Sequence, residues 1–187
     1  MKRNKTSNYL ITILTLAVLI ISTESCKNSS MIPPIKELEI TAAQQAWGVG
    51  IVSIGVAHAN GDDYKKTAND FIERFYSFDS EKVIFKPMLA EHKPFRLTSE
   101  GALSYLIGGN DSYPEDAGFA LQEWKNVKWN NAGIINGQSD IAVAMGDYSF
   151  TDKEGEQLMA SYAIAYKRDT NGEIKIVAHK SAIAYKK

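Results

Sequence analysis

The sequence contains one cysteine, Cys26, and three histidines among its 187 residues. A single thiol can form neither an intramolecular disulfide nor a zinc site built from several thiolates. His58, His92 and His179 are far apart in the chain and form no His-x-His or His-x-x-x-His pair. Residues distant in the sequence could still form a metal site in three dimensions, but the spacing of the histidines does not indicate one. We expect no cofactor.

Charge of one sign is also lacking, because 21 basic residues are balanced by 22 acidic ones. Lys2, Arg3 and Lys5 stand at the N-terminus, so the remaining chain is more acidic than the whole. No basic field is left to attract nucleic acid, which we exclude as a partner. A phosphate loop, a Ser-His-Asp pattern and paired carboxylates are missing too, so the usual catalytic motifs are absent.

One long hydrophobic run is present, between Tyr9 and Ile21, and it follows the basic start. It is too short to span a bilayer comfortably, and small polar residues separate it from Cys26. This pattern predicts a signal peptide over residues 1–25. A cysteine just past the junction predicts a bacterial lipoprotein, secreted across the inner membrane and lipid-anchored in the cell envelope at Cys26. An ordinary cleaved signal with an incidental cysteine is the alternative.

The rest of the chain divides into a tether over residues 26–40, which contains Pro33-Pro34, and one domain over residues 41–187. Gly48, Gly50 and Gly55 lower the helix propensity of the first predicted helix by up to ~1 kcal/mol each. That helix must therefore be held by packing, and a sheet is the expected partner. Apolar residues at helical spacing predict helices over 41–58, 62–76 and 101–107.

The last third of the domain is rich in β-forming residues, and turns such as Asn136-Gly137 and Asn171-Gly172 interrupt it. Helices followed by a four-stranded antiparallel meander predict an α+β fold. Strands this long must curl, and a curled sheet around a long helix makes a cone with one open mouth. The predicted long strands are 124–136, 140–151, 157–168 and 173–185, and short strands are predicted at 83–86 and 95–97.

Two polar residues of the last strand, His179 and Ser181, are two positions apart and so project from the same face, together with Lys175 and Val177. Neither face of this strand is cleanly apolar, which suggests that His179 and Ser181 look into a partly polar pocket. An exposed edge or a satisfied hydrogen-bond pair is the alternative.

Three tyrosines and one carboxylate are further candidates. Tyr162 and Tyr166 share a face of the preceding strand and could line a pocket or pack across the sheet. Tyr105 stands near the end of the third predicted helix, where it could reach the mouth of the cone or belong to the core. Asp147 lies within an apolar strand and, if buried, would be a candidate general base.

Several short sequence motifs, taken together and in order, cover most of residues 41–185. Through these motifs the chain resembles secreted bacterial proteins related to the association domain of calcium/calmodulin-dependent protein kinase II. These have the nuclear-transport-factor-two-like (cystatin-like) fold, a cone of N-terminal helices packed in a curved antiparallel sheet. Within that group the chain is most similar to the iota-class carbonic anhydrases. The motifs are residues 41–48, Phe85-Lys86-Pro87, residues 100–105 with Gly108-Gly109, residues 131–134, residues 142–150 and His179-Lys180-Ser181.

The resemblance implies carbon dioxide hydration without a metal, with hydroxyl groups in the cone holding bicarbonate. It assigns Tyr105 and Ser181 to bicarbonate binding and His179 to orienting a water or hydroxyl. A histidine with a pKa near ~6.5 could also shuttle protons. Tyr162 and Tyr166 are expected to line the substrate site. The chain departs from the family pattern at Met88, where the family has threonine, and at Lys180 and Ala182, where it has histidine and serine.

Two other functions fit the same fold. The domain could be a noncatalytic binding module that has lost the family threonine, or an oligomerisation module, and a homodimer is expected in either case. Relatives of this type are sometimes called phosphoribosyl-AMP cyclohydrolases. That name implies a zinc enzyme with several cysteine ligands, and the single Cys26 makes it a misnomer here.

Overall fold

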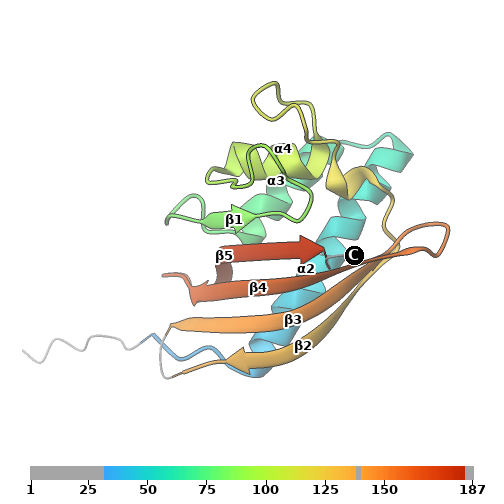
Figure 1. Ribbon diagram of the computed structural model, residues 1–187. Helices are drawn as coiled ribbons and strands as arrows, with labels where there is room; N and C mark the ends of the chain where they lie inside the picture. Colours follow the sequence, from blue (N-terminus) through green and yellow to red (C-terminus); the bar gives the residue numbers. More distant parts are fainter. Residues whose placement is uncertain (1–31, 138–139, 184–187) are drawn as a thin grey trace, which may run out of the picture. The chain divides into compact units, whose positions relative to one another are not determined.

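The computed structural model describes residues 32–137 and 140–183 (Figure 1). The predicted signal peptide and Cys26 lie outside the described residues. In chain order the elements are α2 (Glu37–Asn60), α3 (Tyr64–Phe75), β1 (Ile84–Lys86), α4 (Ser99–Ile107), the 3-10 turn η1 (Phe119–Leu121), β2 (Asn126–Ile135), β3 (Ile141–Thr151), β4 (Gln157–Arg168) and β5 (Ile174–Ile183).

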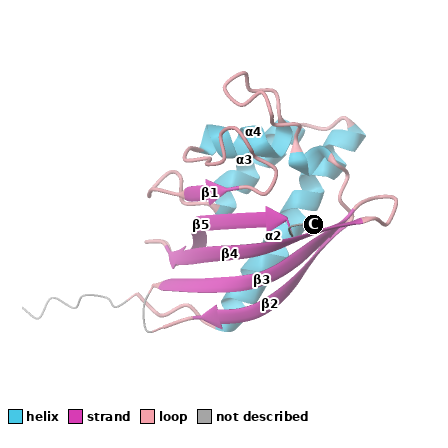
Figure 2. Cartoon of the chain, viewed as in Figure 1, coloured by secondary structure: helices cyan, strands magenta, loops and turns pink. Residues whose placement is uncertain are grey.

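The predicted meander is confirmed, and one more strand joins it. The sheet has five strands in the order β1-β5-β4-β3-β2, with β2 to β5 antiparallel and β1 parallel to β5. The second short strand predicted, at 95–97, is wrong, since only Arg96 forms an isolated bridge with Phe85. The long strands curl, and α2 crosses one face of the sheet, while no helix of residues 32–137 or 140–183 covers the other face (Figure 2). This is the predicted α+β cone.

The first helix begins earlier than the sequence pattern predicted. The carboxylate of Glu39 accepts a hydrogen bond of 2.9 Å from the backbone N–H of Lys36, and α2 begins at Glu37 rather than at Thr41. Just before it, Ile35 is buried and the carbonyl of Pro33 accepts a hydrogen bond from the Arg168 side chain at 3.0 Å. Residues 32–36, predicted as part of a tether, therefore pack against the domain.

Close contacts explain the glycines of α2. A Cβ at Gly50 would lie 2.6 Å from the Phe71 ring of α3, and a Cβ at Gly55 would lie 2.8 Å from the carbonyl oxygen of Ala120 in η1. The helix is held by packing, as expected from its low propensity, on α3 and η1 as well as on β2. Its length and composition would suit a membrane span, but here it is the central helix of the domain.

A β-bulge changes which residues of β5 face the helices. Ala165 pairs with Ala178 and Tyr166 pairs with Ile176, so Val177 is the extra residue. Ile176 is therefore the residue that shares the inner face with His179 and Ser181, and the assignment of Val177 to that face was wrong. Asp147 is exposed on the outer face of β3, so it is not the buried carboxylate that the general-base prediction required.

Candidate active site

The two polar residues predicted on β5 lie together on the inner face of the sheet. The Nε2 atom of His179 is 3.2 Å from the Oγ atom of Ser181, and both side chains are 2% exposed. The phenol of Tyr148, on β3, donates a hydrogen bond of 2.5 Å to the same Oγ atom. In this structure His179 and Ser181 thus form a buried hydrogen-bonded pair, the alternative that the sequence left open beside a partly polar pocket.

The other nitrogen of His179 is held from the helical layer. Its Nδ1 atom is 2.9 Å from the Oη atom of Tyr76, which directly follows α3. The indole N–H of Trp47, on α2, donates to the same Oη atom at 3.3 Å. Trp47 and Tyr148 belong to the sequence motifs on which the resemblance rests. Nothing in the sequence pattern singled out Tyr76, a residue just past a helix end.

Burial decides the charge state of His179. It lowers the pKa of the imidazole to about 3, because the cationic form would be desolvated. Within the described part of the chain, no carboxylate takes part in the hydrogen bonds or ring contacts of His179. His179 is therefore neutral at physiological pH, and the expectation that it shuttles protons with a pKa near ~6.5 is not met.

Tyr105, on α4, reaches the same region from the other side. The ring of Phe85 contacts both Tyr105 and His179, with centroid distances of 5.8 and 5.2 Å. Burial raises the pKa of Tyr105 well above its usual value, and the neighbouring phenol of Tyr148 raises it further. Among the described residues the Tyr105 hydroxyl has no hydrogen-bond partner, although the backbone amide of Leu89 is near enough to oppose the rise of its pKa.

We call the side chains of Tyr76, Tyr105, Tyr148, His179 and Ser181 the His179 cluster. They come from the chain after α3, from α4 and from β3 and β5, and Trp47 and Phe85 pack against them. Of the three predicted catalytic residues, His179 and Ser181 are hydrogen-bonded to each other, whereas Tyr105 is linked to them through the ring of Phe85, with no hydrogen bond to either among the described residues. Their roles stay predictions.

The two remaining tyrosines predicted to bind substrate lie beside the cluster. Tyr162 stacks on Tyr148 with a centroid distance of 5.2 Å, but its hydroxyl donates to Asn131 at 2.5 Å and accepts from Gln44 at 3.2 Å. Tyr166 is buried opposite Ile176 in the ladder, and burial raises its pKa. Neither hydroxyl has a hydrogen bond to His179 or Ser181. In this structure both side chains pack beside the cluster on the inner face of the sheet.

The loop between β1 and α4 is fastened by Glu115. The carboxylate accepts hydrogen bonds of 2.8 to 3.0 Å from the backbone N–H groups of residues 91–93. These bonds lower its pKa to about 2. Next to it, the fully buried Arg96 donates to Asp116 at 2.6 Å, and Asp116 accepts from Ser104 of α4 at 2.6 Å. The loop that carries Met88 is thereby fixed to the helix that carries Tyr105.

Comparison with known proteins identifies the family. Residues 38–183 match the profile of the metal-independent carbonic anhydrases. The chain is also 36% identical over 170 residues to the metal-independent carbonic anhydrase of Nostoc sp. (strain PCC 7120), covering 89% of this chain and 82% of that protein. The chain belongs to the metal-independent carbonic anhydrase family.

Solved structures agree with that assignment. The crystal structure of a cyanobacterial iota-carbonic anhydrase complexed with bicarbonate superposes with a TM-score of 0.80 at 34% identity, covering 84% of this chain and 96% of that one. A calcium/calmodulin-dependent protein kinase II association domain from Xanthomonas campestris, at 17% identity and a TM-score of 0.56, shares the fold. It covers 80% of this chain and 88% of that one. The resemblance stated from the sequence is confirmed for family and fold.

Two of the three departures from the family pattern lie away from the His179 cluster. Lys180 alternates with His179 and Ser181 and is exposed on the outer face of β5. Ala182 pairs with the exposed Ser161 and points the same way. Met88 differs, because it is half-buried against the core. Of the three departures, Met88 is therefore the one that packs against the interior of the domain.

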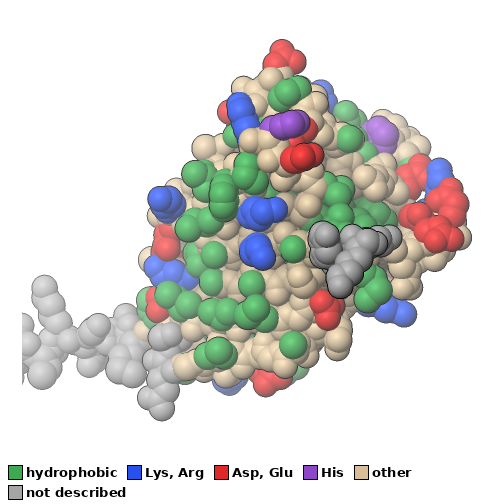
Figure 3. All heavy atoms as spheres, viewed as in Figure 1, with side chains coloured by type: hydrophobic (Ala, Val, Ile, Leu, Met, Phe, Trp, Pro, Cys, Tyr) green, Lys and Arg blue, Asp and Glu red, His purple; other side chains and the backbone are tan. Residues whose placement is uncertain are grey.

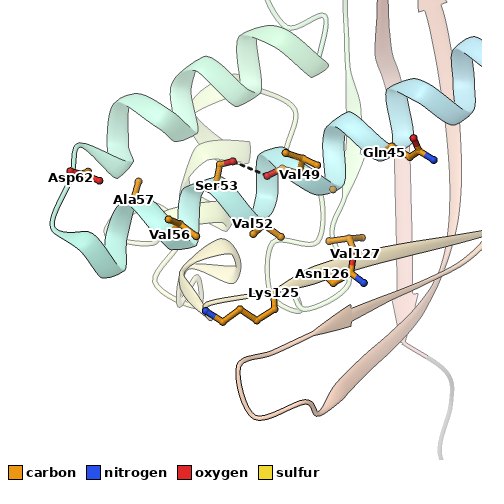
Figure 4. A pocket seen from close by; sticks show the side chains of 11 residues that line it. Gln45, Val49, Val52, Ser53, Val56, Ala57, Asp62, Lys125, Asn126 and Val127 are labelled. Atoms are coloured by element: carbon orange, nitrogen blue, oxygen red, sulfur yellow. Dashed lines mark hydrogen bonds between the residues drawn. The ribbon is translucent and has the colours of Figure 1, made fainter.

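A separate groove of about 660 Å³ runs between α2 and the start of β2 (Figure 4). Val49, Val52 and Val56 of α2 line it together with Lys125 and Val127. It shares no residue with the His179 cluster. Within residues 32–137 and 140–183, no three histidine, cysteine, aspartate or glutamate side chains are grouped so that they could hold a metal ion.

Proposed function

We propose that this protein is a metal-independent carbonic anhydrase whose bicarbonate site is the His179 cluster. The observation that carries the proposal is the buried hydroxyl of Tyr105, which has no hydrogen-bond partner among the described residues and whose ring packs on Phe85, the ring that also contacts His179 of the Ser181–His179 pair. Buried hydroxyls normally have partners, so an unpaired one is suited to a ligand oxygen. The bicarbonate named for the cyanobacterial relative supplies such oxygens.

The reaction needs stabilisation of charge. Water attacks the carbon of carbon dioxide, a C–O bond forms, one C=O π pair moves onto oxygen, and the proton of the water leaves to solvent. The hydroxyls of Tyr105 and Ser181 donate to the oxygen on which negative charge develops, in a site with little water, where such bonds are strongest. His179 contributes as a neutral group that holds the Ser181 hydroxyl in place.

Stopped-flow hydration of carbon dioxide by chelator-treated protein tests this function. Tyr105→Phe and Ser181→Ala should each abolish the rate, since each removes one hydroxyl that faces the ligand. Matched controls are Tyr64→Phe, on the surface of α3, and Ser161→Ala, on the outer face of β4, both of which should keep full activity. A wild-type rate no higher than buffer, or full activity in both cluster variants, would refute the proposal.

A noncatalytic bicarbonate-binding module is the second candidate, and Met88 favours it. Where the family has a threonine hydroxyl, this chain has a thioether against the core. Losing one such contact weakens anion binding by about 1–3 kcal/mol without removing the other two groups. Binding of bicarbonate with no hydration rate would select this function over the enzyme.

The outer face of the sheet supports a homodimer. Phe95 and Ile84 are about half exposed there, and with small residues of β3, β4 and β5 they line a hollow of about 530 Å³. Basic side chains stand in the middle of this apolar face (Figure 3). Lys86 and Lys180 are neighbours in the ladder and form no ion pair among the described residues, whereas Asp147 is exposed on the same face. A two-fold partner would cover the apolar side chains and bring carboxylates to the lysines.

We also propose that the mature protein is tethered to the cell envelope by a lipid on Cys26. The support is the order of the N-terminal sequence: basic residues, a short apolar run, small residues and then the cysteine. A carbonic anhydrase held there would act on carbon dioxide and bicarbonate outside the cytoplasm.

A further inference from the structure

The hydrogen bonds around His179 form one chain from an indole to a phenol. Four contacts join five groups: Trp47 Nε1 to Tyr76 Oη at 3.3 Å, Tyr76 Oη to His179 Nδ1 at 2.9 Å, His179 Nε2 to Ser181 Oγ at 3.2 Å, and Ser181 Oγ to Tyr148 Oη at 2.5 Å. The indole, the neutral imidazole and the three hydroxyls each carry one polar hydrogen. Five hydrogens serve four contacts, so one hydrogen has no acceptor within the chain.

The first possible place for that hydrogen is Tyr76. If Nδ1 of His179 carried the proton, it would donate to Tyr76 Oη, as Trp47 already does, and the hydrogen of Tyr76 itself would be left over. Tyr76 is 2% exposed, has no other hydrogen-bond partner among the described residues, and lies against the rings of Phe78 and Phe85. A polar hydrogen stranded among aromatic rings is costly, so this arrangement is disfavoured.

The second possible place is the opposite end of the chain. If Nε2 carries the proton, Tyr76 donates to Nδ1 and Nε2–H donates to Ser181. The hydrogen left over then belongs to the Ser181–Tyr148 pair. Tyr105, whose hydroxyl has no hydrogen-bond partner among the described residues, packs against Phe85, the ring that also contacts His179.

We propose that Tyr76, held by Trp47, fixes His179 in the Nε2–H tautomer and so makes the Ser181–Tyr148 pair a hydrogen-bond donor to a bound oxyanion. The tautomer depends only on this series of hydrogen bonds, whereas the donation of a hydrogen bond to bicarbonate rests on the proposed function. Tyr76 is a positioning residue, because it acts through His179 and does not touch the ligand. With Tyr105 as a second donor, the cluster offers hydrogens and accepts few, which selects anions such as bicarbonate over neutral donors.

The tautomer can be read directly from the ¹⁵N NMR shifts of His179 in the full chain labelled at histidine. We expect a protonated, pyrrole-type shift for Nε2 and an unprotonated, pyridine-type shift for Nδ1 at neutral pH. The His179→Gln variant assigns the signals against those of His58 and His92. The reverse pattern in the wild-type protein overturns the inference, and this reading needs no variant of Tyr76.

Tyr76→Phe removes the hydroxyl while keeping the ring. We expect it to populate both tautomers of His179 and to weaken bicarbonate binding and slow hydration by roughly tenfold. Tyr64→Phe leaves all five groups of the hydrogen-bond chain in place, so the His179 shifts and the hydration rate should be unchanged. Unaltered His179 shifts in Tyr76→Phe, or altered shifts with unaltered bicarbonate binding, would contradict the proposal.

The two proposals fail in different ways. A wild-type protein with the Nε2–H tautomer and bicarbonate binding but no hydration rate would refute the enzyme and keep the role of Tyr76. An active protein with the Nδ1–H tautomer would keep the enzyme and refute the role of Tyr76.

Discussion

His179 and Lys180 are neighbours in the chain but lie on opposite faces of β5. The imidazole is 2% exposed within the His179 cluster, and the lysine is exposed on the outer face. A strand alternates its side chains between faces, so a substitution at position 180 cannot replace a group of the cluster. The lysine at this position is therefore a feature of the outer surface.

Lys180→His, which restores the family residue, should leave the hydration rate within about twofold of the wild-type value, because no group of the cluster changes. Stopped-flow assays at equal protein concentration check this. The comparison is His179→Gln, which should lose most of the activity. A gain of tenfold or more from Lys180→His would show that the outer face takes part in the reaction.

Met88→Thr should strengthen bicarbonate binding. A hydroxyl at this half-buried position adds one donor, which is worth about 1 kcal/mol, or several-fold in affinity. Titration with bicarbonate and the hydration rate together measure the effect. Leu89→Thr, one residue along and partly exposed, is the control and should change neither value. Equal behaviour of the two variants would mean that residue 88 does not face the ligand.

The hydrogen bonds to Glu115 make stability depend on pH in acid. Its pKa is lowered to about 2 from the model-compound value of 4.5, so the unfolded state takes up its proton first. The contribution of Glu115 to stability is complete above about pH 4.5 and is lost as the pH falls toward about 2. Urea unfolding between pH 7 and pH 2.5 should show less acid sensitivity in Glu115→Gln than in wild type. Glu73→Gln, an exposed carboxylate of α3, should retain the wild-type slope.

The outer face of the sheet can be tested by adding charge to it. Ala163→Glu places a carboxylate within the hollow lined by Ile84 and Phe95. If this face is the dimer contact, the variant should be a monomer in multi-angle light scattering at concentrations where wild type is a dimer. Ala59→Glu, at the exposed end of α2, should leave the dimer intact. A strictly monomeric wild-type protein would remove this part of the proposal.

Cys26→Ser tests the envelope anchor. The wild-type protein should partition into the detergent phase and incorporate labelled fatty acid, whereas the variant should do neither, because serine cannot form the thioether to the lipid. Lipid labelling of Cys26→Ser equal to that of wild type would contradict anchoring at this residue. A wild-type protein found in the soluble fraction would favour the ordinary cleaved signal.

Local signals carried most of the secondary structure. The third predicted helix ends where α4 ends, at Ile107, although the side chain of Thr98 accepts from the N–H of Gly101 and α4 begins two residues earlier than predicted. β4 has the predicted bounds. The turn at Asn171-Gly172 was also predicted correctly, and Gly172 has a φ of 85° that most other residues avoid. These features depend on residues that are near one another in the chain, which is why the sequence reveals them.

Features that depend on distant partners were missed. The short strand at 83–86 was predicted, but its parallel pairing with β5 was not. The bulge at Val177 has no glycine to mark it, and it reverses the inside–outside alternation for the residues before it. Tyr76 has a role because the fold brings it to His179, 103 residues further on. The resemblance gave the family and three cluster residues, but the hydrogen-bond chain behind them needed coordinates.

The lone phenol of Tyr105 also ties the energetics of the fold to its ligand. Whenever nothing takes up its hydrogen, the native state bears a penalty of about 1–3 kcal/mol that a phenylalanine would spare it. Any oxyanion that relieves the penalty stabilises the native state as it binds. Tyr105 thus lowers the stability of the ligand-free protein and increases the stabilisation that a bound oxyanion provides.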